Sequence, residues 1–93
     1  MSFKIKKIVF DKAFDKKFYK YRDQLIEKDR LRLKKAIAIF SEDPFDSRLN
    51  THKLNGAHKD YWSCRISYSD RIIFRLLDDG VVYLMDIGPH DVY

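Results

Sequence analysis

Hydrophobic and polar residues alternate most clearly in residues 61–74, which predict two short antiparallel strands joined by a bend near Ser67–Asp70. The apolar positions of this segment recur every second residue: Trp62, Cys64, Ile66, Ile72 and Phe74. This spacing in aromatic and β-branched residues is typical of strands that bury one face. We therefore expect this pair to form the centre of the fold.

Two helices are predicted before this strand pair, as a hairpin that covers one face of the sheet. Phe14, Phe18 and Tyr21 follow a helical spacing, with Asp11 as a candidate N-cap. After a break within residues 21–24, a second helix extends to about residue 41. Pro44 ends it, because the residue before a proline is forced out of the α region.

The other segments complete an α+β pattern. Residues 3–9 predict a first strand at or near a sheet edge, and residues 45–60 are expected to form an irregular polar loop. A tight turn at residues 78–80 precedes a final strand at residues 81–87. The order β-α-α-β-β-β predicts a single domain over residues 1–93, a two-helix hairpin packed on a mostly antiparallel four-stranded sheet.

Composition favours a folded protein in a reducing compartment. The chain has 93 residues, of which 45% are hydrophobic, so a packed core is expected. Its lone cysteine, Cys64, excludes an internal disulfide and is predicted to be a small buried hydrophobe. No apolar run approaches the roughly 20 residues of a membrane span, and no signal peptide is evident. We expect a soluble cytoplasmic protein that does not enter membranes.

Charge divides the chain into a basic and an acidic part. Residues 1–40 hold 13 Lys or Arg against 5 Asp or Glu, whereas residues 41–93 hold 6 against 9. The basic part indicates an anionic partner, such as nucleic acid or an acidic protein.

Five residues from three segments could meet on one exposed patch of the sheet and carry chemistry: His52, Arg65, Asp70, Arg71 and His90. Two imidazoles and two guanidiniums suit RNA cleavage without a metal. One imidazole takes the proton of the attacking 2′-hydroxyl and the other protonates the leaving 5′-oxygen, while arginines stabilise charge on the phosphate. An aspartate can orient one imidazole.

Structural alternatives fit the same residues. Arg65 and Arg71 could pair with acidic residues on a solvated sheet face, and His58 is expected to be incidental loop surface. A metal site of His52, His90 and Asp91 lacks the paired spacing of known motifs. From the residues alone, a nuclease is permitted and is not established.

Four motifs resemble the RelE/StbE branch of the RelE/ParE toxin superfamily: Thr51–Gly56 (THKLNG), Tyr61–Ile66 (YWSCRI), Asp70–Phe74 (DRIIF) and Asp86–Tyr93 (DIGPHDVY). The resemblance implies a toxin of a type II toxin–antitoxin pair that acts as an mRNA interferase, a ribosome-dependent endoribonuclease that needs no cofactor. Its partners would be a cognate antitoxin, the ribosome and mRNA.

The resemblance also implies residue roles. In YafQ-like members, the positions of His52, Asp70 and His90 act together in catalysis, although the segment between Gly56 and Asp70 is one residue longer here. In YoeB-like members, the positions of Arg65 and Arg71 bind phosphate, and a terminal aromatic, here Tyr93, can stack on a base. Lys53 is also expected to bind RNA or its phosphates. Which histidine is the base stays open.

Two other functions stay open at this point. One is a ParE-like binding toxin that inhibits gyrase without cutting RNA, although such chains generally lack the histidine pair. The other is a non-catalytic relative that only binds an antitoxin. In the toxin cases, the antitoxin is expected to cover the Arg65–Arg71 face or to dock a helix on the sheet or the helical hairpin.

Overall fold

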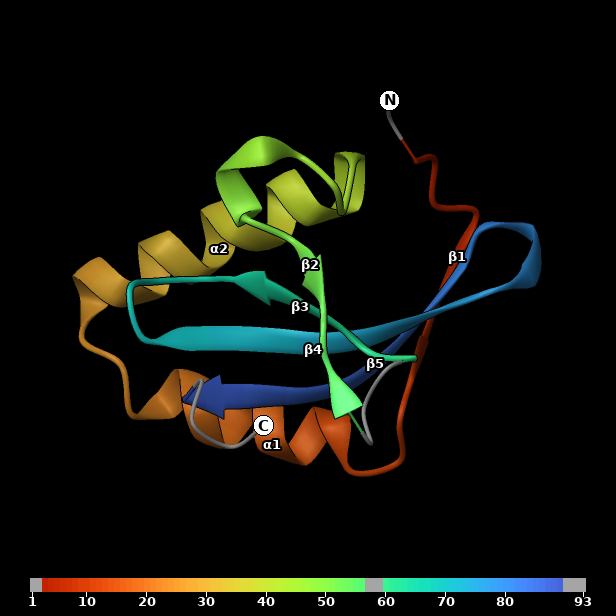
Figure 1. The fold of residues 1–93 in the computed structure, drawn as a ribbon. Coiled ribbons are helices and arrows are strands. Elements are labelled where there is room, and N and C mark those ends of the chain that lie inside the picture. The colour runs from red at the N-terminus through yellow and green to blue at the C-terminus, as the bar shows by residue number, and fades with distance from the viewer. Residues whose placement is uncertain (1–2, 57–59, 90–93) are drawn as a thin grey trace.

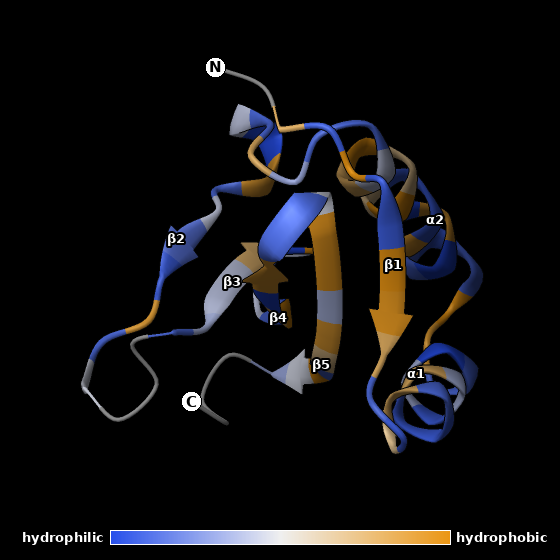
Figure 2. Cartoon of the chain, turned by 90° about the vertical axis from the view of Figure 1, so that its right-hand side faces the viewer, coloured by the Kyte–Doolittle hydropathy of each residue, from blue (hydrophilic) through white to orange (hydrophobic). Residues whose placement is uncertain are grey.

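Two helices lie on one side of a five-stranded sheet in the computed structural model, which describes residues 3–56 and 60–89 (Figures 1 and 2). The elements in chain order are β1 (Lys7–Phe10), α1 (Phe14–Asp23), α2 (Glu27–Glu42), η1 (Ser47–Leu49), β2 (His52–Lys53), β3 (Trp62–Arg65), β4 (Asp70–Leu77), η3 (Asp78–Gly80) and β5 (Val81–Pro89). The predicted α+β class and the helical hairpin before the central strands are confirmed. No helix in the described ranges is long and apolar enough to cross a membrane.

The sheet has the order β1-β5-β4-β3-β2 and is antiparallel except for the pairing of β1 with β5. The first strand lies at an edge, as expected. The strand count differs from the prediction, because His52 and Lys53 form a short strand against β3 instead of lying in an irregular loop. A hydrogen bond from Leu54 N to Tyr61 O, 2.9 Å long, extends this pairing. Two residues are too few to show an alternating pattern, so β2 could not be predicted from the sequence.

The core lies between the helices and the strands. Phe74 is fully buried at the centre of β4, and its ring meets that of Phe40 from α2 edge to face with centroids 5.0 Å apart. Cys64, Ile72 and Val82 come from three adjacent strands and belong to the same cluster. Hydrophobic residues dominate β1 and much of β5, whereas polar residues cover the outward sides of the helices (Figure 2).

The start of α1 lies slightly beyond the predicted N-cap. Helical geometry begins at Phe14, and Ala13 occupies the capping position. Asp11 still serves the helix start, because its Oδ1 accepts a hydrogen bond from Ala13 N at 3.1 Å and its carbonyl accepts one from Phe14 N. The carboxylate therefore satisfies an amide at the entrance to the helix, as caps do.

Candidate functional site

The sheet face opposite the helices carries a group of polar side chains from three neighbouring strands. Cys64 and Ile72 are buried in the core, and successive side chains of a strand point to opposite faces. The register aligns Arg65 with Arg71 and His52 with Ser63. These four residues therefore share the face away from the helices and are called the outer cluster: His52, Ser63, Arg65 and Arg71.

Two polar atoms of the outer cluster are buried and find no hydrogen-bond partner among the described residues. They are Arg71 Nη1 and Ser63 Oγ, and Ser63 is fully buried. Buried polar groups in folded proteins nearly always have a partner, and an unpaired guanidinium N–H is costly. Arg65 is exposed, and neither arginine forms an ion pair within residues 3–56 and 60–89. The alternative of simple surface ion pairs is thus not seen, and the cluster is suited to receive an anion.

A local hydrogen bond holds the imidazole ring of His52 and determines its tautomer. Its Nδ1 lies 3.0 Å from the carbonyl oxygen of Asn50, which ends η1 in the left-handed conformation with φ 48°. A carbonyl only accepts, so Nδ1 carries the proton and Nε2 of the neutral ring is an acceptor. The side chain is exposed at the edge of the sheet. His52 can therefore accept a proton from a bound molecule through Nε2.

Asp70 lies apart from the outer cluster. Its carboxylate Oδ2 accepts a hydrogen bond from the Tyr21 hydroxyl of α1, and Ser69 Oγ donates to Oδ1 at 3.3 Å. The expectation that all five chemistry-bearing residues share one patch therefore does not hold for Asp70, which points toward the helices. Its neighbour Arg71 points the other way because side chains alternate along β4.

The remaining predicted residues fall in different places. Lys53 pairs with Trp62 in the register, and its Nζ lies 5.5 Å from the centroid of that ring, within cation–π range. Lys53 therefore points to the opposite face from His52. His90 and Tyr93 lie outside the described residues.

Thiol and metal chemistry find no support in the described chain. Cys64 is buried, and this burial raises the pKa of its thiol to about 12, so it stays protonated as the sequence analysis expects of a core residue. In the part of the chain that the structure describes, no three His, Cys, Asp or Glu side chains are grouped as a metal site would require.

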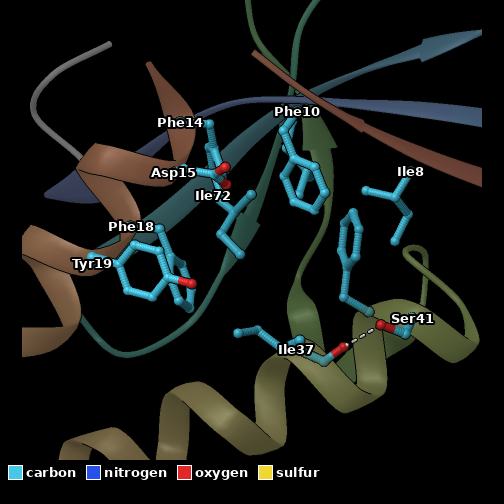
Figure 3. Close-up of a pocket in the computed structure, with 11 residues that line it drawn as sticks. Ile8, Phe10, Phe14, Asp15, Phe18, Tyr19, Ile37, Ser41 and Ile72 are labelled. Atoms are coloured by element: carbon cyan, nitrogen blue, oxygen red, sulfur yellow. Dashed lines mark hydrogen bonds between the residues drawn. The ribbon is translucent and has the colours of Figure 1, made fainter. Parts of the chain in front are cut away.

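A second feature is an apolar cleft between α1, α2 and the sheet, with a volume of about 370 Å³ (Figure 3). Aromatic rings dominate its lining: Phe10, Phe14, Phe18, Tyr19 and Phe40. Phe10 and Tyr19 remain 51% and 52% exposed. The helical stripe expected from the sequence packs on the core, with Phe14 buried and Phe18 and Tyr21 partly buried against it, but the cleft beside the stripe was not predicted. The signal for the cleft that the sequence offered was Tyr19, an aromatic residue of α1 that lies outside the helical stripe of Phe14 and Phe18.

Comparison with known proteins identifies the family. The family model described as bacterial toxin of type II toxin–antitoxin system, YafQ, matches residues 6–92. The chain belongs to the YafQ family. It is therefore a toxin of the YafQ/RelE kind, as the motifs of the C-terminal half predicted. A comparison with curated proteins finds no match.

Solved structures of YafQ and related toxins share the fold. YafQ from E. coli BL21(DE3) superposes with a TM-score of 0.68 at 16% identity, covering 91% of this chain and 93% of that one. The YoeB/ParE toxin from Agrobacterium tumefaciens gives 0.69 at 20% identity, covering 90% and 98%. The archaeal RelE–RelB complex from Pyrococcus horikoshii OT3 gives 0.63 at 18% identity and covers 96% of both chains. At these identities the likeness concerns the fold alone.

Proposed function

We propose that this YafQ-family toxin is a ribosome-dependent endoribonuclease that cuts translated mRNA and inhibits translation, without a metal in the reaction. The observation that carries the proposal is the outer cluster. Among the described residues, Arg71 Nη1 is buried without a hydrogen-bond partner and the exposed Arg65 forms no ion pair, on the face that also holds the accepting Nε2 of His52. A phosphodiester supplies the oxygens that these donors lack, beside a group able to take a proton.

The proposed reaction begins with proton removal from the ribose 2′-hydroxyl by His52 Nε2. The 2′-oxygen attacks the adjacent phosphorus, the bond to the 5′-oxygen breaks, and the products are a 2′,3′-cyclic phosphate and a 5′-hydroxyl. Arg65 and Arg71 stabilise the charge that develops on the phosphate oxygens. Because the tautomer of His52 suits a base, we assign the leaving-group proton to His90, whose role rests on the resemblance, as does base stacking by Tyr93.

The basic helices supply a second contact to RNA in this proposal. The lysines of α1, among them Lys16 and Lys20, are exposed, as are Lys34 and Lys35 of α2. Lysines that neutralise RNA phosphates release counterions and so favour binding to ribosomal RNA. A toxin that acts on translated messages works in the cytoplasm.

The direct test is induced expression in a bacterial host with primer extension on two reporter mRNAs. One reporter is translated, and its matched control lacks a start codon. We expect growth arrest and discrete cuts in the translated reporter alone. Cuts in both reporters would contradict ribosome dependence. Growth arrest with intact mRNA would instead favour a binding toxin of the gyrase-inhibitor kind.

We also propose that an antitoxin neutralises this toxin by placing the apolar side of an acidic amphipathic helix in the α1–α2 cleft. An E. coli DinJ–YafQ toxin–antitoxin complex is among the structures with this fold. In the present chain, the exposed rings of Phe10 and Tyr19 in the cleft offer apolar anchors. Lysines exposed on the two helices, among them Lys16 of α1 and Lys34 of α2, are complementary in charge to an acidic helix.

Phe10→Glu combined with Tyr19→Glu is expected to weaken binding of the antitoxin by at least about tenfold, because a carboxylate in an apolar cleft loses its hydration. Calorimetric titration of toxin with antitoxin measures this effect. Leu77→Glu, at an exposed apolar position outside the cleft, is the control. Unchanged affinity of the double variant, with binding lost on changing Arg65 and Arg71 to Glu, would place the antitoxin on the outer face instead.

A further inference from the structure

Asp70 ties the bend between β3 and β4 to the first helix. Its carbonyl oxygen accepts hydrogen bonds from Ile66 N at 2.9 Å and Ser67 N at 3.4 Å, which close the bend. Its carboxylate accepts a hydrogen bond from the Tyr21 hydroxyl, 49 residues earlier in the chain. We call this side-chain contact the Tyr21–Asp70 latch.

The Tyr21 hydroxyl is a stable donor in this contact. Tyr21 is partly buried and packs against the core cluster. Burial and, after it, the hydrogen bond and charge of Asp70 raise the pKa of the phenol well above its ordinary value, while Ser67 opposes the rise. The phenol therefore keeps its proton throughout the physiological range. Charge-assisted hydrogen bonds of this kind are stronger than neutral ones.

The latch involves the residue directly before Arg71 of the outer cluster. Asp70 is the first residue of β4 and is held toward α1, so the pleat directs Arg71 to the opposite face. There Arg71 lies between Arg65 of β3 and Gly88 of β5 in the register. Gly88 has no side chain to support the guanidinium. The start of β4, where Arg71 lies, is therefore held by the latch as well as by its pairing with β3 and β5.

We propose that Tyr21 and Asp70 are positioning residues that hold Arg71 on the outer face, and that Asp70 is not itself a catalytic residue. The proposal rests on the nuclease function proposed above for the outer cluster. It differs from the sequence expectation, in which the Asp70 carboxylate acts together with His52 and His90. An asparagine at position 70 separates the two roles. It can still accept the hydrogen bond from the Tyr21 hydroxyl, as a positioning residue must, but it cannot act as a catalytic carboxylate.

Three variants separate the roles. Tyr21→Phe removes only the donor, Asp70→Ala removes the acceptor, and Asp70→Asn keeps a neutral acceptor oxygen for the Tyr21 hydroxyl. Tyr83→Phe is the matched control, because the Tyr83 hydroxyl also donates to a carboxylate, Asp11 Oδ2, at 3.1 Å. Cleavage of translated mRNA is measured against pH, together with thermal unfolding of each variant.

We expect Tyr21→Phe and Asp70→Ala each to lower cleavage about tenfold without changing the shape of the pH profile, and their double variant to be no worse than either alone. Asp70→Asn and Tyr83→Phe should retain most activity. Loss of activity in Asp70→Asn equal to that in Asp70→Ala, with Tyr21→Phe at the wild-type level, would overturn the proposal and support a catalytic carboxylate.

A measurement without RNA distinguishes failure of this proposal from failure of the nuclease function. The side-chain Nε–Hε signal of Arg71 in an NMR spectrum of the free toxin reports its surroundings. We expect this signal to shift or broaden in Tyr21→Phe and to stay in place in Tyr83→Phe. An unchanged Arg71 signal in Tyr21→Phe would refute the latch, even if the wild-type protein cuts mRNA.

Discussion

Arg71→Ala is expected to reduce mRNA cleavage by roughly 10²–10³-fold while leaving the fold intact, the effect typical of removing one donor to a developing oxyanion. Nη1 of this residue is buried and has no partner among the described residues, so the substitution removes no hydrogen bond that the free protein makes at that atom. The first-order rate of cleavage in a translating extract measures the loss, and circular dichroism with thermal unfolding checks the fold.

Arg75→Ala is the matched control for this prediction. Arg75 lies on the same strand and the same face as Arg71, but it is exposed and pairs in the register with Tyr83 outside the outer cluster. We expect this control to cut RNA within about threefold of wild type, since a surface charge contributes little. Equal losses in both variants would mean that the arginines act only through general charge. Unfolding of Arg71→Ala would make Arg71 a structural residue.

His52→Gln is expected to lower the cleavage rate by roughly 10²–10⁴-fold, the usual contribution of a general base. Glutamine can still form hydrogen bonds but cannot take up the 2′-hydroxyl proton. The cleavage rate under single-turnover conditions measures this loss.

His58→Gln serves as the control for His52→Gln, because it makes the same chemical change at a histidine to which the sequence analysis assigned no role. It should leave the cleavage rate as in wild type. If His52→Gln retained full activity, the base would have to be another group, and the assignment of Nε2 would be wrong.

The sequence predicted the central strands and the two helices because their apolar residues recur at the spacing of each element. It could not predict β2, which is only two residues long and depends on pairing with Trp62 and Ser63. Nor did it show the irregularity between β4 and β5, where Ile73 aligns with Asp86 and Phe74 with Leu84, so that Met85 is skipped. Such shifts depend on strand pairing and leave no trace in a periodic pattern.

The candidate site was predicted in part. The alternation that buries Cys64 and Ile72 also places Arg65 and Arg71 on the opposite face, so their pairing could be read from the sequence. The same alternation gives Asp70 the parity of Ile72 and Phe74, which is a signal for the helix-facing side that the sequence analysis did not use. Tyr21 as its partner could not be foreseen, because that contact depends on how α1 docks on the sheet.

The chemistry of the RNA ends is the sharpest test of cleavage by attack of the 2′-hydroxyl on the scissile phosphate. Purified toxin is added to a translating extract, and the fragments of a defined message are analysed for their termini. We expect cuts that leave a 2′,3′-cyclic phosphate and a 5′-hydroxyl, and no cut where the nucleotide before the scissile phosphate carries a 2′-deoxyribose. Fragments with 3′-hydroxyl and 5′-phosphate ends, or an intact message in an arrested extract, would contradict it.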